Sequence, residues 1–115
     1  MWIFTRDGFF SVVNDYDCKE NELMVRARNS DDLHRFLDHV SGTSRAEIIE
    51  MDHADYRYRV KLPRTAVIGY MVVELDSLRY PNFKATIDYK DTERSIAYHE
   101  IWNAMYAFQQ HQGQT

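Results

Sequence analysis

Few side chains in this sequence could support acid–base, nucleophilic or metal chemistry, and none belongs to a recognised motif. The chain has five histidines and one cysteine, Cys18. His34 and His39 are five residues apart, whereas a helical metal-binding pair is separated by four, and His99-Glu100 is not followed by a second histidine at zinc-protease spacing. The sequence also lacks a Gly-rich phosphate loop and a Gly-flanked nucleophilic serine. We therefore expect a non-enzymatic protein with no catalytic residues, no metal ligands and no cofactor.

One arrangement keeps a small hydrolase or transferase as a distant third alternative. His53 lies between Asp52 and Asp55 and could form a hydrogen-bonded site, although aspartates are also common in turns. Cys18 is interpreted as a bystander loop thiol, because the sequence offers no evident histidine partner. Because a single thiol cannot form an internal disulfide, the cysteine content fits a reducing compartment.

Composition predicts one folded domain rather than a disordered or membrane-spanning chain. The 115 residues are 44% hydrophobic and 14% aromatic, which is enough apolar surface for a core. The N-terminal residues lack the basic start and long apolar run of a signal peptide, so we expect a cytoplasmic protein without membrane contact. The net charge of −4 argues against general coating of nucleic acid but allows a local basic patch. We expect one domain over residues 1–110 and a frayed tail over residues 111–115.

Periodicity predicts an α+β fold. Alternating or apolar runs predict five strands, and Asp7-Gly8 is suited to the hairpin turn between the first two. Ser30 is expected to cap a helix with an apolar stripe from Leu33 to Val40 that stops at Gly42. The expected strands cover residues 2–5, 9–13, 22–28, 47–52 and 56–62.

Two further helices are expected in the second half of the chain. Pro63 ends the last strand and Thr65 can cap a helix over residues 66–78. A final helix starts at Asp91 or Thr92 and reaches Gln110. The resulting order is β-β-β-α-β-β-α-α, an antiparallel sheet with helices on one face, in part like a ferredoxin-like sandwich.

The first candidate binding surface is a basic face of this sheet. If the strands over residues 22–28 and 56–62 are neighbours, their alternation brings five cations to one exposed face, opposite Tyr56, Tyr58, Val60 and Leu62. An open sheet face with arginine and aromatic groups is used by several proteins that bind single-stranded nucleic acid. Alternatively, these cations are paired with acids such as Glu47 or Glu50 on neighbouring strands. The five residues are Arg26, Arg28, Arg57, Arg59 and Lys61.

The second candidate surface is a loop with the residues Arg79, Tyr80, Asn82, Phe83 and Lys84. Aromatic side chains and arginine are enriched at the energetic centres of protein–protein interfaces, so this loop could contact a protein. Alternatively, Tyr80 and Phe83 pack back onto the core and anchor the loop.

Clustered acids suggest a third idea, in which the protein imitates DNA phosphates. One cluster contains Asp15, Asp17, Glu20 and Glu22; a second contains Asp31, Asp32 and Asp38. The excess of acids over bases is mild, however, at 18 against 14. Asp31 and Asp32 also suit the positive end of a helix dipole.

Several segments resemble a family of small, functionally uncharacterised proteins of bacteria and their phages. The segments are Trp2 to Val13, which begins Trp-Ile-Phe-Thr-x-Asp-Gly-Phe-Phe-Ser; Leu23 to Arg28; Asp55 to Val60; Tyr80-Pro81-Asn82-Phe83-Lys84; and Trp102 to Tyr106. The resemblance covers most of the chain and implies no activity.

Taken together, these features favour a non-catalytic module that binds a host protein. The family resemblance would make it a phage-encoded or phage-derived effector or inhibitor of bacterial machinery, such as a defence system. The alternative is a nucleic-acid or phosphate binder that uses the basic sheet face. A homodimer would be expected if the last helix exposed an apolar stripe around Trp102.

Overall fold

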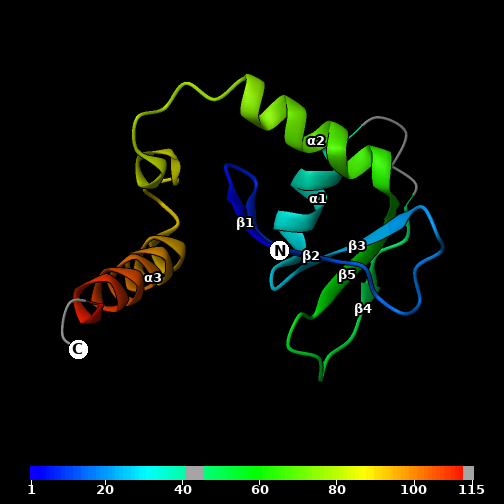
Figure 1. Ribbon diagram of the computed structural model, residues 1–115, viewed down its shortest axis with the longest axis horizontal. Helices are drawn as coiled ribbons and strands as arrows, with labels where there is room; N and C mark the ends of the chain where they lie inside the picture. Colours follow the sequence, from blue (N-terminus) through cyan, green and yellow to red (C-terminus); the bar gives the residue numbers. More distant parts are fainter. Residues whose placement is uncertain (41–45, 113–115) are drawn as a thin grey trace. The chain divides into compact units, whose positions relative to one another are not determined.

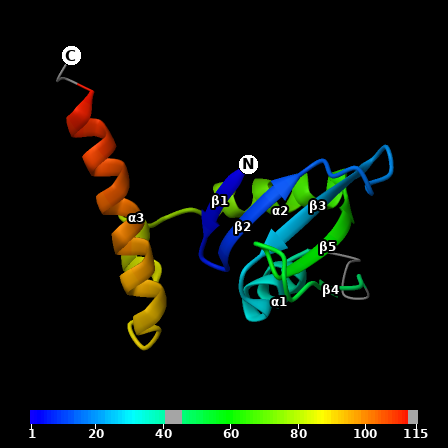
Figure 2. The same ribbon diagram turned by 90° about the horizontal axis from the view of Figure 1, so that it is seen from below.

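The computed structural model describes residues 1–40 and 46–112, which form two compact units, Met1–Leu78 and Arg79–Thr115. The first unit contains a five-stranded antiparallel sheet with two helices (Figures 1 and 2). The α+β class and the antiparallel sheet are therefore as predicted. None of the helices in the described ranges is long and apolar enough to cross a membrane.

The sheet has the strand order β1-β2-β3-β5-β4. The pairing places β5 between β3 and β4, so the run from β3 to β5 forms a split β-α-β arrangement, while β2 occupies the other side of β3. The strands are β1 (Trp2–Thr5), β2 (Gly8–Val13), β3 (Glu22–Ala27), β4 (Ile49–Glu50) and β5 (Tyr58–Pro63).

The hairpin between β1 and β2 turns at Arg6 and Asp7, because Thr5 pairs with Gly8. The sequence predicted that Gly8 is part of the turn. In the structure Gly8 is instead the first residue of β2. Its φ of +145° is in a region that L side chains rarely adopt, and a Cβ there would collide with the side chain of Asp32. Glycine is therefore required for both backbone angle and space.

Two helices, α1 (Ser30–Asp38) and α2 (Arg64–Asp76), pack on one face of the sheet. The apolar stripe predicted for the first of them is buried at Leu33, Phe36 and Leu37. Phe36 contacts Phe10 of the sheet and stacks on Tyr70 of α2, with ring centroids 5.0 and 3.8 Å apart. The core is therefore one layer between this sheet face and the two helices.

Both predicted caps of these helices are wrong. Asn29, not Ser30, caps α1, because Asn29 has an extended backbone and its side chain accepts hydrogen bonds from the amides of Asp31 and Asp32. At α2 the helix starts directly after Pro63 with no side-chain cap, so Thr65 lies inside its first turn. Gly42, the predicted stop of α1, lies outside the described residues.

Two predicted strands also have different limits. The strand expected over residues 47–52 is reduced to two residues, since beyond Glu50 the chain turns back and Met51 bonds with Arg57. The strand expected from Tyr56 starts at Tyr58 instead. Tyr56 therefore lies before the hydrogen-bonded part of β5, and its side chain does not have to follow the alternation of that strand.

The second unit contains a short 3-10 helix, η1 (Phe83–Thr86), and the helix α3 (Thr92–His111), capped by Asp91. Residue 111, expected in the frayed tail, is still helical, while residues 113–115 lie outside the described part of the chain. No residue of α3 is buried.

Candidate binding face of the sheet

The sheet face opposite α1 and α2, here called the outer face, carries a continuous row of side chains across all five strands. Residues paired directly across antiparallel strands project to the same side. The register therefore aligns one residue from each strand, from β1 to β4: Trp2, Ser11, Arg26, Arg59 and Ile49. Two of the five predicted cations thus lie side by side in the centre of the sheet.

Aromatic side chains lie next to this row. Phe9 stacks on Phe4 with ring centroids 4.6 Å apart, and it also contacts Trp2 and Tyr56, each at 6.3 Å. Trp2 is 72% exposed, whereas Tyr56 is only 3% exposed. The outer face therefore combines the accessible indole of Trp2 with neighbouring aromatic side chains that pack against one another.

Two guanidinium groups sit on the Tyr56 ring. The central carbons of Arg26 and Arg28 are 4.5 and 4.4 Å from its centroid. The two positive charges therefore lie within about 9 Å of one another. Tyr56 thus faces the arginines, which corrects the prediction that it points to the opposite side from them.

Neutral groups hold the arginines in place. Arg26 donates to the Ser11 hydroxyl at 2.7 Å, and Arg28 donates to the backbone oxygen of Asp55 at 2.6 Å. Arg59 donates to the backbone oxygen of Tyr56 at 3.1 Å and approaches the sulfur of Met24. The Nε atoms of Arg26 and Arg59 are buried and have no hydrogen-bond partner among the described residues.

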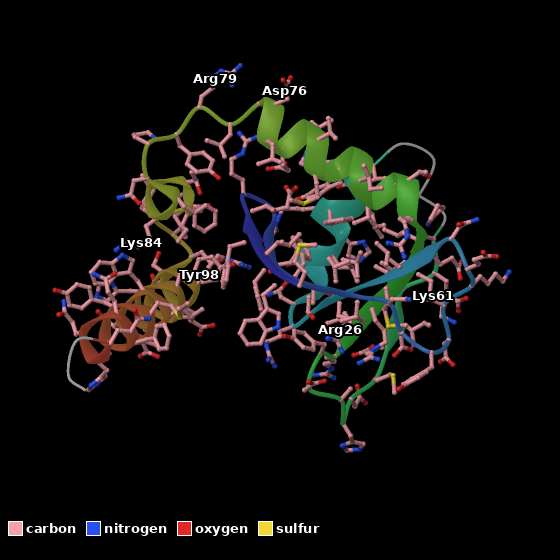
Figure 3. The ribbon with its side chains drawn as sticks, in the orientation of Figure 1. Arg26, Lys61, Asp76, Arg79, Lys84 and Tyr98 are labelled. Carbon is pink, nitrogen blue, oxygen red and sulfur yellow. The ribbon has the colours of Figure 1, made fainter. Side chains whose placement is uncertain are left out.

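The charges of these cations are not neutralised by acids. Within the part of the chain that the structure describes, none of Arg26, Arg28, Arg59 and Lys61 forms an ion pair with a carboxylate. Lys61 pairs across the sheet with Met24, which places it one row from Arg26 (Figure 3). Of these four residues Arg28 is exposed, whereas Arg26, Arg59 and Lys61 are only partly exposed.

Arg57 behaves differently from the other four. It forms ion pairs with Glu50 at 3.1 Å and with Asp52 at 3.0 Å. The pKa of Arg57 is raised by the Tyr58 phenol and by the Asp52 and Glu50 carboxylates beside it. The alternative of acid pairing, raised for the whole face, thus applies to Arg57 and not to its neighbours.

The loop with Arg79 to Lys84 belongs to the second unit, where its aromatic residues pack internally. Phe83 lies between Tyr80 and Tyr98, with ring centroids 6.0 and 6.1 Å away. Asn82 caps η1 through its side chain, and the ammonium of Lys84 lies 4.9 Å from the Trp102 ring centroid. These residues anchor the loop on α3, while Arg79 is exposed (Figure 3).

The other groups considered for chemistry are placed as follows. His53 is exposed; its neighbour Asp52 pairs with Arg57, and Asp55 accepts from the amide of Tyr56. The acid Asp32 is buried, where it accepts from the amide of Phe9 and pairs with Arg35, so it is unavailable for mimicry of DNA. The sequence reasoning missed one contact altogether: His39 meets the carboxylate of Asp7, which is 32 residues away in the chain.

Comparison with family models, curated proteins and solved structures gives no match to this chain.

Proposed function

We propose that this protein binds single-stranded nucleic acid on the outer face of its sheet. The observation that carries the proposal is the group of three arginines, Arg26, Arg28 and Arg59, which are held by neutral partners on the same sheet face as exposed Trp2. Guanidinium groups without a carboxylate partner favour phosphate, and an accessible indole can stack on any base. A net charge of −4 with this local basic face favours a few directed contacts over general coating.

The expected salt dependence follows from the number of cations. If three or four phosphates are contacted, the logarithm of the binding constant should fall with the logarithm of salt with a slope of about −2 to −3. Fluorescence anisotropy of a labelled 12-nucleotide strand, as DNA and as RNA, measures this slope between 50 and 200 mM salt. A slope near zero would contradict phosphate recognition.

Variants separate this face from the rest of the surface. Arg26→Ala with Arg59→Ala should abolish binding of the labelled strand. Arg57→Ala is a matched control, because this neighbouring arginine is already neutralised by Glu50 and Asp52. If the Arg26→Ala, Arg59→Ala double variant and Arg57→Ala lost equal affinity for the strand, the effect would depend on overall charge and not on this face.

The exposed indole provides a second test. Trp2→Ala should weaken binding by about 1–3 kcal/mol, the usual contribution of stacking one base on an aromatic ring. In a Trp102→Phe background Trp2 is the sole tryptophan, so its fluorescence should be quenched when the strand binds. Unchanged fluorescence at saturating strand would exclude stacking on Trp2.

A second candidate function is binding of a host protein through α3. The observation in its favour is an exposed apolar group on this helix, with Trp102, Met105 and Phe108 between 49 and 61% exposed. Such a group on a helix is typical of a segment that lies in a partner's groove, and it is also the condition given above for a homodimer. The resemblance to bacterial and phage proteins would make the partner a component of the bacterial host, with a cytoplasmic location.

Affinity capture from bacterial lysate, with and without nuclease and at two salt concentrations, compares the two functions. A discrete protein that survives nuclease and salt, and is lost with Trp102→Ala and Phe108→Ala, supports the second candidate. Nucleic acid that is lost at the higher salt, and is lost with the Arg26 and Arg59 variants, supports the first. Glu100→Gln on an exposed polar position of α3 is the control for the helix variants.

A further inference from the structure

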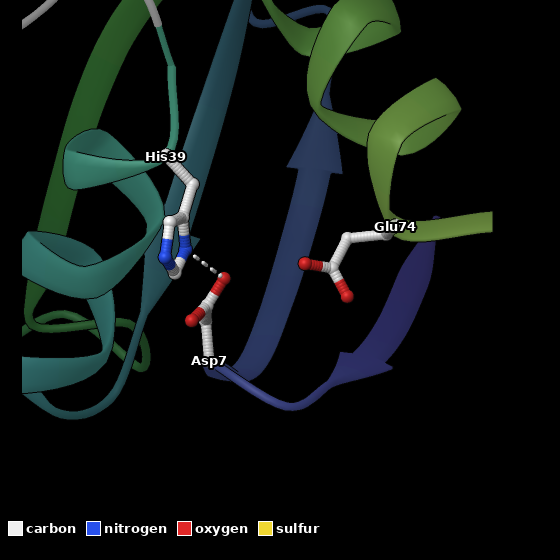
Figure 4. Close-up of side chains that lie close together, drawn as sticks. All are labelled: Asp7, His39 and Glu74. Atoms are coloured by element: carbon white, nitrogen blue, oxygen red, sulfur yellow. Dashed lines mark hydrogen bonds and ion pairs between the residues drawn. The ribbon is translucent and has the colours of Figure 1, made fainter. Parts of the chain in front are cut away.

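Three side chains that can bind metal ions come together in the first unit (Figure 4). Asp7 lies in the turn between β1 and β2, His39 follows α1 as its C-cap, and Glu74 lies in the last turn of α2. One ligand atom from each residue lies within 4.8 Å of the other two. Imidazole and carboxylate groups are donors that a divalent transition metal accepts.

The two carboxylates are largely shielded from water. The side chains of Asp7 and Glu74 are 6 and 14% exposed, and that of His39 is 56% exposed. Glu74 forms a long ion pair with Arg6, whose Nε is 3.9 Å from the carboxylate. Arg35 is engaged by Asp32 and by the backbone oxygen of Asp7. The site therefore holds two acids near one another, Glu74 in a long contact with Arg6 and Asp7 in contact with His39, an arrangement that a dication would stabilise.

A second layer of hydrogen bonds orients Asp7. The hydroxyl of Tyr70 donates to its Oδ2 at 2.7 Å, and Thr5 Oγ1 lies 2.7 Å from the same hydroxyl. The amide of Asp7 donates to Thr5 Oγ1 at 3.1 Å. Burial raises the pKa of Tyr70, so the hydroxyl remains a neutral donor to the carboxylate. Metal sites rely on such outer partners to fix their ligands.

An Asp7–His39 ion pair alone would explain the 2.9 Å contact between Oδ2 and Nδ1. It would not explain why Glu74 lies beside this pair as a second, nearly buried carboxylate. A metal ion explains all three positions, because it would bridge Asp7, His39 and Glu74 and neutralise both acids. Three protein ligands leave a coordination position for water, and the exposed His39 ring marks the open side.

We propose that Asp7, His39 and Glu74 bind one divalent transition-metal ion of the zinc class.

The test is titration of chelator-stripped, untagged protein with zinc chloride by calorimetry at pH 7.5. We expect one ion per chain and no comparable binding of magnesium, which prefers oxygen ligands. His39→Ala and Glu74→Gln should each lower the zinc affinity at least tenfold. His34→Ala is the matched control, because it removes an exposed histidine of the same helix and should leave the affinity unchanged.

Far-UV circular dichroism of each variant confirms that it is folded, and cobalt(II) in place of zinc gives a visible spectrum that reports the ligand set. A cobalt spectrum that loses its intensity in His39→Ala supports the site. Absence of zinc uptake by the wild-type protein, or uptake that survives both His39→Ala and Glu74→Gln, overturns it.

Discussion

Removing the hydroxyl of Tyr70 by Tyr70→Phe tests the polar network beneath the two helices. The ring of Tyr70 is 2% exposed and stacks on Phe36 with centroids 3.8 Å apart, a contact that phenylalanine keeps. The hydroxyl contacts Asp7 and Thr5, each at 2.7 Å. The substitution therefore deletes two buried hydrogen bonds while leaving the packing of the ring in place.

The loss of stability in Tyr70→Phe comes mainly from the hydrogen bond that the hydroxyl donates to the Asp7 carboxylate. A hydrogen bond to a charged group contributes about 1.5–3 kcal/mol, and Thr5 keeps its bond from the Asp7 amide. We expect a loss of about 2 kcal/mol, or a fall in Tm of roughly 8–16 °C for a unit of this size. Urea and thermal unfolding followed by circular dichroism at pH 7 measure it. Tyr16→Phe, at a fully exposed tyrosine, is the control and should change neither value.

The difference in the free energy of unfolding between wild type and Tyr70→Phe should decrease as the pH rises. Because burial raises the pKa of Tyr70, the folded protein keeps this proton above pH 10 while the unfolded chain, with an ordinary tyrosine pKa of about 10, loses it. Unfolding then releases a proton, so a rise in pH favours the unfolded state. The stabilising effect is complete below pH 10 and should fall by about 1.4 kcal/mol at pH 11. A loss below about 0.5 kcal/mol at pH 7, or a difference that is the same at pH 8 and 11, would refute the reasoning.

Further predictions concern the backbone and the caps. Gly8→Ala should destabilise by more than about 1 kcal/mol, because its positive φ and the Asp32 side chain exclude a Cβ, whereas Gly69→Ala, at an open position in α2, should stabilise by about 0.5–1 kcal/mol. Urea unfolding of both variants checks this, and equal signs would contradict it. Asn29→Ala should cost about 1 kcal/mol through loss of the α1 cap, while Asn14→Ala in an exposed loop should be neutral. If the two asparagine variants unfold at the same urea concentration, Asn29 is not an effective cap.

Local patterns were sufficient for most of the elements. The alternation of Leu23, Val25 and Ala27 predicted β3, and the spacing of Leu33, Phe36 and Leu37 predicted α1, because one face of each is buried in the core. The caps were harder, since neighbouring polar residues such as Asn29 and Ser30 have similar cap propensities and only the backbone angles distinguish them.

The residues that come together in the two candidate sites could be identified only from the fold. Alternation alone placed Arg57 with Arg59, but the ladder of β5 starts after Arg57, whose partners Glu50 and Asp52 are fixed by the hairpin with β4. The contact between Asp7 and His39 depends on how α1 packs against the first hairpin. No spacing along the chain encodes such a contact.

The strand order also has a consequence for the folding mechanism. The connections from β1 to β3 are short, whereas the centre of the sheet joins Val25 to Val60, which are separated by α1 and β4. Closing that long segment costs chain entropy before its contacts form, so the β3–β5 pair should set the folding rate. We expect higher Φ-values for Val60→Ala than for Ile3→Val at the edge of the sheet. The reverse order would mean that the local hairpin nucleates folding and that β5 docks after the barrier has been crossed.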